Sequence, residues 1–375
     1  MVMPRQMLFQ AISGQKPMIQ PVVKELPIND DQIQIASIDF RLGMHAYAMS
    51  VSSLPHGEKV SQLIEKFKHY SFDLSFDKTH FLERKKTYII PLLEQCSLPK
   101  DIHIAFSPKS STGRPDVFTR VICDNHSQFD TTPAGYQGPL YLEVTPLSFH
   151  VLVKAGLTLV QGRLKSVKSR PLGEKELRRL HGEGGIVFDL KGKRFAQKDL
   201  RIEKDRFYFH INLASDIVGF RARPAIKPLD MTRSDNHKPE DFWEPIRRPK
   251  SGSLELQPDE FMLLGTMERV RIPPEVCGEI LPFEMKTGEF RPHYAGFFDN
   301  GFGGAHGTTG VLEVRGLTLP FRLVHGQPIC AMVFEKTFEL PSKLYEGHYK
   351  TSGPSLSKHF KDRYDAWNKK HWSHA

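Results

Sequence analysis

The sequence has few cysteines and lacks any long apolar segment. Four cysteines occur in 375 residues, and no two of them form a C-x-x-C pair (Cys96, Cys123, Cys277, Cys330). The spacing gives no sign of a zinc ribbon or a redox-active dithiol, so we expect reduced, buried thiols. No segment approaches the roughly 20 apolar residues of a membrane-spanning helix, and the N-terminal residues lack the apolar stretch of a secretion signal. We therefore expect a cytoplasmic protein that does not enter a membrane.

The charge of the chain is positive, with a net value of +9. Such an excess is compatible with nucleic-acid binding, with an anionic small ligand or with a solvated basic surface. Basic residues concentrate in segments 165–179 and 247–250, where no aromatic residues are interleaved with them. Because single-stranded nucleic acids are bound largely by stacking on aromatic side chains, we expect solvated linkers and loops there, and no nucleic-acid partner.

Two parts of the chain repeat the same order of features. Segment 88–107 contains an apolar strand, a glutamate, a Leu-Pro pair and a second apolar stretch, and segment 261–281 repeats this order, so that Glu94 corresponds to Glu268. The tripeptide Leu-Glu-Val also occurs twice, at 142–144 and 312–314. Because 375 residues suffice for two ordinary domains, the repeat predicts a duplicated domain.

The apolar segments of both halves predict a mainly β protein. They are short, rich in β-branched and aromatic residues, and separated by Gly, Pro, Asp and Asn, as in small β-barrels and sandwiches. We expect two tandem domains of this kind with few peripheral helices, the clearest helix covering 58–69. The predicted boundaries are 1–165 for the first domain, 166–184 for a basic linker and 185–375 for the second domain.

A polar stretch at 231–253 interrupts the second half. We expect a surface insertion there, and its Phe242-Trp243 pair could instead dock on a partner, since polar loops rarely carry Trp without a place to bury it.

A group of small hydroxyl residues and cations occurs at 107–116, with the sequence SPKSSTGRPD. Lys109, Ser110, Ser111 and Arg114 offer a positive charge, two short hydroxyl donors and a two-pronged guanidinium, which together suit phosphate oxygens. The spacing of a Walker loop is absent. Turns of this composition are more often ordinary surface loops, so the interpretation depends on neighbouring motifs.

Those neighbouring motifs follow in a defined order. They are Ser37-Ile38-Asp39-Phe40-Arg41-Leu42-Gly43, the Ser110–Arg114 group, Phe129-Asp130, Gly135-Tyr136-Gln137-Gly138 and Leu142-Glu143-Val144. In this order they make the first half similar to the deoxycytidine triphosphate (dCTP) deaminase family of the dUTPase-like superfamily.

The resemblance implies hydrolysis of dCTP to dUTP and ammonia. Lys109, Ser110, Ser111 and Arg114 would contact the phosphates, Asp130 and Tyr136 the nucleoside, and Glu143 would carry the protons. No cofactor is implied for the chemistry, and Mg²⁺ would bind only with the triphosphate. The family is trimeric, with the phosphate loop and the glutamate of one site from neighbouring subunits. Such a homotrimer would bind dCTP and dUTP, with dTTP as a candidate inhibitor.

The second half resembles the same family in other motifs. The nucleoside hairpin would include Ala295 and Asp299, Glu313 stands at the glutamate position, and the closing tail would supply Tyr345, Tyr349 and Lys358. Glu289 stands where the first half has its phosphate-binding arginine, and a carboxylate there would repel a triphosphate. Two arrangements stay open: a ring of first domains that uses Glu143, or paired domains in which Glu313 completes the site with Ala295 and Asp299.

Deamination of cytosine requires one carboxylate that carries protons. A glutamate with a pKa raised by burial can take a proton from water and deliver it to the ring nitrogen and the leaving ammonia. The H-x-E and P-C-x-x-C pattern of zinc deaminases is absent from the sequence. The competing interpretations are a dUTPase or a bifunctional enzyme that uses Asp130 or Asp299 to activate water, and a non-catalytic nucleotide-binding protein.

Overall fold

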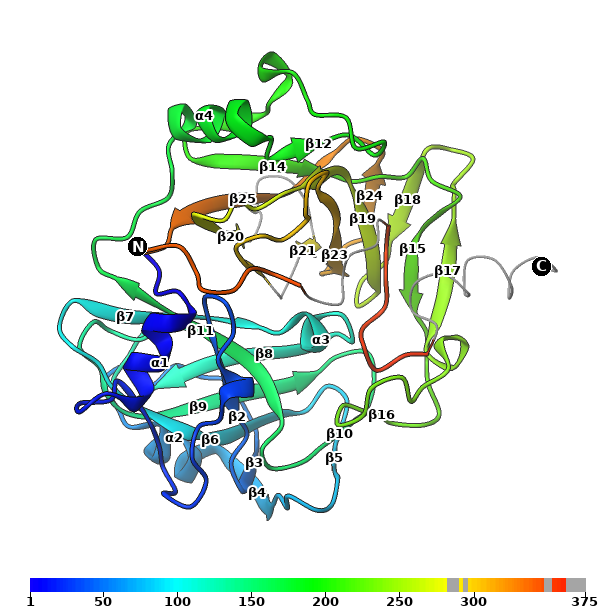
Figure 1. Cartoon of the computed structure of the whole chain (residues 1–375). Helices are drawn as coiled ribbons and strands as arrows, with labels where there is room; N and C mark the ends of the chain where they lie inside the picture. The colour runs from blue at the N-terminus through cyan, green and yellow to red at the C-terminus, as the bar shows by residue number, and fades with distance from the viewer. Residues whose placement is uncertain (282–289, 293–295, 347–352, 362–375) are drawn as a thin grey trace. The chain divides into compact units, whose positions relative to one another are not determined.

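The computed structural model describes residues 1–281, 290–292, 296–346 and 353–361 (Figure 1). The chain divides into two compact units. Unit 1 comprises Met1–Ser169, Lys227–Arg233 and Thr337–Lys343, and unit 2 comprises Arg170–Ile226, Ser234–Lys336 and Leu344–Ala375. Unit 1 therefore includes two short segments from the second half of the sequence.

Unit 1 is built from short strands. They are β1 (Ile19–Pro21), β2 (Ile38–Arg41), β3 (His45–Met49), β4 (Lys68–Asp73), β5 (His80–Leu82), β6 (Thr87–Ser97), β7 (Ile102–Pro108), β8 (Val117–Cys123), β9 (Gln137–Pro146), β10 (Val151–Val153), β11 (Thr158–Ser166) and β16 (Leu229–Asp230). The largest sheet has the order β4-β3-β6-β9-β8, with β1 also on β6, and the smaller sheets have the orders β2-β11-β7 and β16-β10-β5. The helical segments are α1 (Arg5–Ser13), α2 (Val60–Phe67), α3 (Ser110–Gly113) and the 3₁₀ helix η1 (Asp30–Gln32).

The alternation of side chains along β9 determines what each face of the largest sheet carries. Leu140, Leu142 and Val144 are completely buried in the core, so the residues between them point to the opposite face. Glu143 is one of these, and it lies directly opposite Ile89 of β6 on one side and Arg120 of β8 on the other. Directly paired residues share a face, so these three side chains are neighbours.

Unit 2 repeats this design. Its strands are β12 (Val187–Phe188), β13 (Ile202–Glu203), β14 (Arg206–His210), β15 (Ile217–Ala222), β17 (Trp243–Arg247), β18 (Ser253–Leu256), β19 (Phe261–Val270), β20 (Val276–Leu281), β21 (Phe290–Pro292), β22 (Phe297–Phe298), β23 (Thr308–Gly316), β24 (Phe321–Val324) and β25 (Pro328–Lys336). The sheet orders are β17-β15-β19-β23-β21 with β12 on β19, β13-β14-β25-β20-β22, and β18-β24. The helical segments are α4 (Glu174–Gly184), η2 (Gln197–Asp199) and η3 (Pro239–Asp241).

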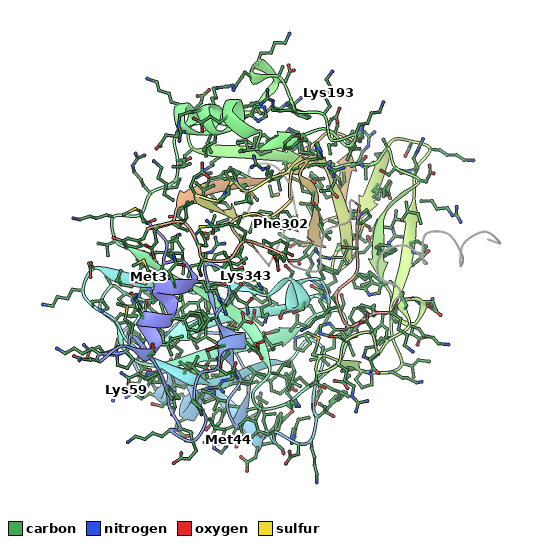
Figure 2. The ribbon with its side chains drawn as sticks, viewed as in Figure 1. Met3, Met44, Lys59, Lys193, Phe302 and Lys343 are labelled. Atoms are coloured by element: carbon green, nitrogen blue, oxygen red, sulfur yellow. The ribbon has the colours of Figure 1, made fainter. Side chains whose placement is uncertain are left out.

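The core of unit 2 includes residues from the segment that we expected to link the domains. Helix α4 lies in that segment, and its Leu177 and Leu180 pack into the core. Phe302, labelled in Figure 2, belongs to the same core. Burial of leucines at helical spacing stabilises α4 against the sheet.

The predicted duplication is visible in one buried glutamate contact of each unit. In unit 1 the backbone N of Arg41 donates to Glu94 Oε2 at 2.8 Å, and its Nε donates to Oε1 at 2.7 Å. In unit 2 the backbone N of His210 donates to Glu268 Oε2 at 2.9 Å, and its Nδ1 contacts Oε1 at 2.6 Å. The two glutamates thus anchor equivalent strands, as the sequence repeat predicts.

The expectation of a surface insertion at 231–253 is wrong. This stretch contains strand β17, which pairs with β15, and Phe242 and Trp243 are both about 1% exposed. Their rings lie 5.5 and 6.1 Å from that of Phe360, so the pair packs inside its own unit. Both aromatic side chains are buried within unit 2, so they do not form a docking surface for a partner.

Other predictions are confirmed. The fold is mainly β, helix α2 lies within the predicted range 58–69, and all four cysteines are buried and free. Within the described ranges, the helices are too short or too polar to cross a bilayer.

Candidate active site

The residues predicted to bind the phosphates form a single helical turn. Helix α3 connects β7 to β8, and the backbone N of Gly113 donates to the carbonyl of Lys109 at 3.0 Å. Ser111 and Arg114 are buried, whereas Ser110 is half-buried. The turn brings Ser110 and Arg114 together because residues four apart are neighbours on one face of a helix.

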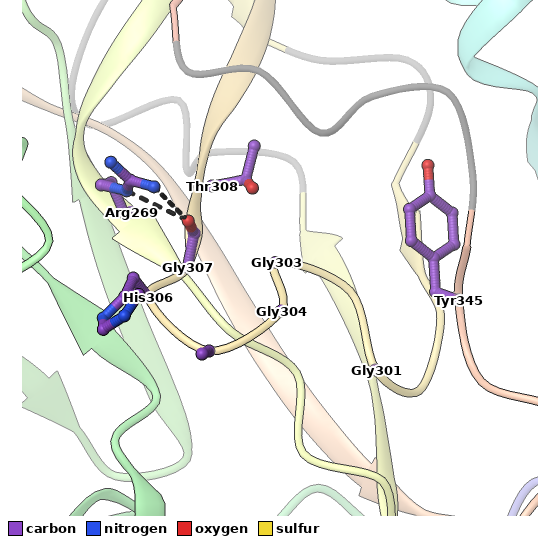
Figure 3. A pocket seen from close by; sticks show the side chains of 9 residues that line it. Arg269, Gly301, Gly303, Gly304, His306, Gly307, Thr308 and Tyr345 are labelled. Carbon is purple, nitrogen blue, oxygen red and sulfur yellow. Dashed lines mark hydrogen bonds between the residues drawn. The ribbon is translucent and has the colours of Figure 1, made fainter.

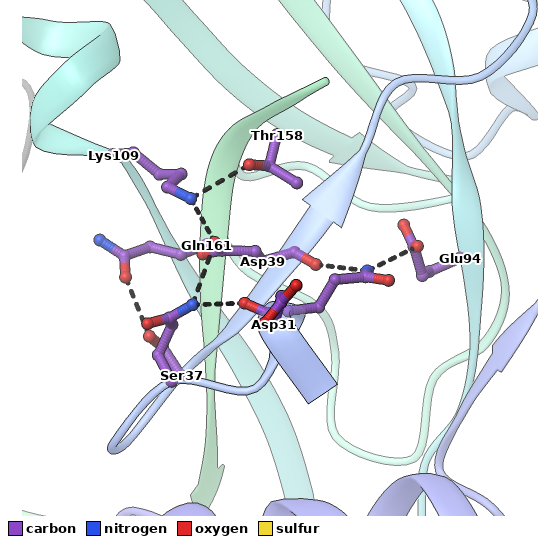
Figure 4. A network of polar contacts seen from close by, with 9 residues as sticks. Asp31, Ser37, Asp39, Glu94, Lys109, Thr158 and Gln161 are labelled. Carbon is purple, nitrogen blue, oxygen red and sulfur yellow. Dashed lines mark hydrogen bonds and ion pairs between the residues drawn. The ribbon is translucent and has the colours of Figure 1, made fainter. Parts of the chain in front are cut away.

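Lys109 is engaged within unit 1. Its ammonium forms an ion pair with Asp39 of β2 and donates to Thr158 Oγ1 at 3.0 Å (Figure 4). The amide of Gln34 also donates to Asp39 Oδ2, at 3.3 Å. Since Asp39 compensates the positive charge of Lys109, this lysine offers less attraction to a phosphate than the sequence suggested.

Glu143 is a buried carboxyl with one occupied oxygen. Its side chain lies on β9 in a residue that is 3% exposed, and Oε1 accepts a hydrogen bond from Ser52 Oγ at 2.8 Å. Oε2 is buried and has no hydrogen-bond partner among the residues that the structure describes. Burial raises the pKa of Glu143 to about 7, and the bond from Ser52 and the charge of Arg120 oppose this rise.

An apolar cluster lies on the same face of the sheet as Glu143. Ile89 and Ile122 come from the sheet, and Val60 and Ile64 of α2 pack on them. Further members or packed neighbours are Met49, Tyr47, Leu54, Phe129 and Tyr141. The segment that carries Ser52 and α2 therefore covers this face within unit 1, which explains the low exposure of the carboxyl.

Asp130 is held by two donors. Its Oδ2 forms an ion pair with Arg120, and its Oδ1 accepts a hydrogen bond from the backbone N of Val121 at 2.9 Å. The guanidinium of Arg120 also lies over the rings of Phe118 and Phe129, at 4.7 and 5.6 Å. Burial raises the pKa of Asp130, although Arg120 opposes this. Both oxygens of Asp130 are thus occupied, and Arg120 is a site neighbour that the sequence motifs did not reveal.

Tyr136 uses its hydroxyl in its own turn. The hydroxyl donates to the carbonyl of Pro139 at 2.7 Å and accepts from the backbone N of Asp124 at 3.2 Å. Gly135 precedes it with a φ of +75°, a conformation that glycine adopts without strain. These contacts give Tyr136 a structural role in the hairpin turn.

The described candidate residues of unit 2 lie on β23, in the turn after β22 and in the tail. Glu313 is buried on β23 opposite Leu263. Asp299 starts the turn in which its carbonyl accepts from the backbone N of Phe302 at 3.0 Å. The ring of Tyr345 packs on Phe302 with centroids 5.2 Å apart.

Lys358 lies in the described part of the tail, between Gly353 and Lys361. The carbonyl of Lys358 accepts from the backbone N of Asp235 at 2.9 Å. Ala295, Tyr349 and Glu289 lie outside the described residues.

A glycine-rich turn follows this hairpin and borders a cavity of about 380 Å³ (Figure 3). Four glycines occur within seven residues, at 301, 303, 304 and 307. Arg269 donates from Nε and Nη2 to the carbonyl of Gly307 at 3.0 and 2.8 Å, and Tyr345 lies on the other side of the turn. The hairpin predicted from the sequence ends at Phe302, so the prediction did not include residues 303–307 or Arg269, although such a density of glycines in the sequence indicates close backbone approach.

The sequence assigned two groups of unit 1 to one site, Glu143 and the residues around α3. In the described part of the chain, Glu143 makes no hydrogen bond or ion pair with Lys109, Ser110, Ser111 or Arg114. No three His, Cys, Asp or Glu side chains of the described residues are grouped as metal ligands would be.

Models of one enzyme family match both halves of the chain. The model of the 2'-deoxycytidine 5'-triphosphate deaminase N-terminal domain matches residues 2–168, and the model of the C-terminal domain matches residues 173–360. The chain belongs to this deaminase family. The resemblance found in the sequence motifs is thereby confirmed, with one family domain in each half.

Individual relatives agree with this deaminase family. A protein of Methanosphaera stadtmanae named "dCTP deaminase, dUMP-forming" is 27% identical over 209 residues, which cover 52% of this chain and 97% of that protein. A protein of the same name from Methanobrevibacter smithii is 27% identical over 186 residues, covering 48% and 86%. The crystal structure of the 2'-deoxycytidine 5'-triphosphate deaminase from Agrobacterium tumefaciens superposes with a TM-score of 0.80 at 36% identity, covering 91% of this chain and 99% of that chain.

Proposed function

We propose that this family member hydrolyses dCTP to dUTP and ammonia, with Glu143 as the residue that carries the protons. The observation that supports this role is a buried carboxyl with a pKa of about 7 and one oxygen without a partner among the described residues. A carboxyl of this kind is partly ionised at neutral pH, so it can accept a proton and return it.

The proton transfers follow from the two states of Glu143. The ionised carboxylate takes a proton from water while the water oxygen bonds to C4 of cytosine, and the protonated carboxyl then delivers this proton to N3. A second transfer moves the other proton of the water to the amino group, the C4–N bond breaks and ammonia leaves. One water is consumed, and dUTP and one ammonia are formed.

The triphosphate would be bound by Ser110, Ser111 and Arg114. The two hydroxyls are short donors, and the guanidinium can donate two parallel hydrogen bonds to one phosphate. Lys109 contributes less, because Asp39 already compensates its charge. Mg²⁺ would accompany the triphosphate and neutralise part of its charge.

The site would be shared between chains. In a homotrimer, the phosphate loop of one chain and the glutamate of the next would contact the same nucleotide. The lack of a hydrogen bond or ion pair between Glu143 and that loop among the described residues is compatible with this arrangement, because groups at the two ends of a nucleotide do not touch one another.

Glu313 is the second candidate for the proton carrier. The observation that favours it is the cover over Glu143, where Ser52 occupies one oxygen and α2 packs on the neighbouring isoleucines. A cytosine could reach Glu143 only if the segment that carries Ser52 and α2 left a path to the carboxyl. In the alternative, Glu313 with Ala295 and Asp299 serves the nucleoside, and Arg114 still serves the phosphates.

A second activity, hydrolysis of the triphosphate to dUMP, is suggested by the names of the two 27% identical relatives. That reaction needs a carboxylate that activates water next to the α-phosphate. Asp130 has both oxygens occupied by Arg120 and the backbone of Val121, which favours dUTP as the released product.

The test is a complete product balance with dCTP as substrate. We expect ammonia and dUTP in equal amounts, little pyrophosphate, and inhibition by added dTTP. Pyrophosphate and dUMP in amounts equal to ammonia would show the bifunctional reaction. Binding of dCTP without release of ammonia would show a non-catalytic nucleotide-binding protein.

A further inference from the structure

Unit 2 contains a cavity of about 500 Å³ that the proposed reaction does not use. Its apolar lining includes Phe195, Phe207 and Met267, and its polar lining includes Arg201 and His210. Small-molecule sites in proteins have this size and this combination of apolar walls with a few converging polar groups.

The polar groups of this cavity have fixed donor and acceptor roles. Nη1 of Arg201 lies 2.8 Å from Nε2 of His210, and Nδ1 of His210 lies 2.6 Å from Oε1 of Glu268. A guanidinium has only donors, so Nε2 must accept and Nδ1 must carry the proton that is donated to Glu268. Arg201 therefore keeps its full positive charge while it donates to a neutral ring.

The equivalent place in unit 1 is filled by the chain itself. There Arg41 stands in place of His210, and its Nη2 donates to the carbonyl of Leu26 at 2.8 Å. Gln32 covers Glu94 by donating to Oε1 at 2.9 Å. In unit 2 Arg201 contacts the ring of His210, and both residues line the cavity.

We propose that this cavity binds a small aromatic anion, that is, a ring compound with a phosphate or carboxylate group. The ring would pack against Phe195, Phe207 and Met267. The anionic group would replace the neutral His210 ring as acceptor for Arg201, since hydrogen bonds between ionised partners are about twice as strong as those to neutral groups.

The lining carries charges of both signs besides Arg201. Lys191 adds a second cation. Asp189 accepts two backbone N–H groups through Oδ1, and Glu268 is held by His210, so both carboxylates are engaged. Asp199 is the remaining carboxylate of the lining. It is exposed to solvent, as are Lys191 and Arg201, so water screens the charges of all three.

Phenyl phosphate is the probe, because it combines a ring with a phosphate and nothing else. Its dissociation constant would be measured with the full chain by saturation-transfer NMR, together with those of inorganic phosphate and benzyl alcohol. We expect phenyl phosphate to bind at millimolar concentration or below, and each half-compound to bind about tenfold more weakly or worse.

Substitutions in the cavity would show where phenyl phosphate binds. Arg201→Ala should weaken phenyl phosphate binding about tenfold or more. Lys193→Ala is the matched control, since Lys193 is exposed, lies in the same segment and does not line the cavity (Figure 2). Arg201→Gln, which keeps hydrogen-bond donors without the charge, separates loss of charge from loss of fold, and thermal unfolding would verify the fold of each variant.

Three outcomes would overturn the proposal: no binding to the wild-type chain, equal binding to Arg201→Ala, or binding that is lost in Arg114→Lys and kept in Arg201→Ala. The last outcome would place the probe at the phosphate loop of unit 1. The readout is binding and not deamination, so failure of this inference would leave the proposed reaction intact, and the reverse also holds.

Discussion

Ser52 donates a hydrogen bond of 2.8 Å to Oε1 of Glu143, although 91 residues separate them in the sequence. The bond favours the ionised carboxylate and so opposes the effect of burial on the pKa of Glu143. Ser52 thus acts as a positioning residue, which holds the carboxyl in one orientation and keeps its pKa at about 7.

Replacement of Ser52 by alanine should raise the pKa of Glu143 by about 0.5–1 unit, because an acceptor loses its donor. Glu143 must be ionised to accept a proton in the proposed mechanism. The acid limb of the profile of kcat/KM against pH should therefore move to higher pH by the same amount. Ser53→Ala is the control, since the hydroxyl of Ser53 donates to the carbonyl of Leu54 and does not touch Glu143. An unshifted Ser52→Ala profile would exclude this role.

The two glutamates are distinguished by parallel substitutions. Glu143→Gln keeps the acceptor for Ser52 and removes the proton carrier, so turnover should fall by roughly 10²–10⁴-fold with little change in dCTP affinity. Glu313→Gln should have a much smaller effect. Turnover and dCTP affinity would be measured for both variants, and an inactive Glu313→Gln beside an active Glu143→Gln would assign the reaction to unit 2.

Arg114 should matter for phosphate binding through its shape as well as its charge. Arg114→Lys keeps a cation in a buried position and removes the two parallel donors, so dCTP should bind more weakly by about 1.5–3 kcal/mol. Isothermal titration with dCTP would measure this loss. Arg84→Ala, at an exposed position of the same unit, is the control that should bind dCTP normally. Equal affinities of wild type and Arg114→Lys would remove α3 from the site.

The raised pKa of Glu143 also predicts a pH-dependent stability. The folded protein holds this proton up to a pH of about 7, whereas an unfolded chain releases it near a pH of about 4.3. Between these values the folded state binds more protons, so the free energy of unfolding falls as the pH rises. Glu143→Gln has no such proton to lose, so its free energy of unfolding should not fall in this way. From low to high pH, the variant should therefore gain stability relative to wild type, by up to on the order of 3 kcal/mol.

Urea denaturation at pH 5 and pH 8 would measure the effect. Glu65→Gln is the control, because the side chain of Glu65 is 70% exposed and its replacement should change stability equally at both pH values. If the free energies of unfolding of wild type and Glu143→Gln differ by the same amount at both pH values, the raised pKa of Glu143 is contradicted.

Local patterns in the sequence were sufficient for several features. The short apolar segments predicted a mainly β fold, the spacing of apolar residues predicted a helix over 58–69 that is observed at 60–67, and the repeated glutamates predicted the duplication. These signals are local because side-chain periodicity follows directly from backbone geometry.

Contacts between distant residues could not be predicted in this way. The partner of Glu143 is a serine with no motif around it, and Trp243 is buried because β17 pairs with β15. Tyr136 was assigned to the nucleoside from the motif, whereas its hydroxyl donates a hydrogen bond to the carbonyl of Pro139. In each case the deciding interaction depends on which segments meet after folding.

Strand β16 lies far along the chain but belongs to unit 1, where it pairs in parallel with β10. The backbone N of Phe338, also in unit 1, donates to the carbonyl of Val2 at 2.9 Å. A ribosome that has just finished residue 169 has therefore not yet made all of unit 1, which is completed only when 337–343 emerge. A gene cut between the two repeats would yield a first half without one of its strands, so the two copies are now inherited, synthesised and folded as one piece.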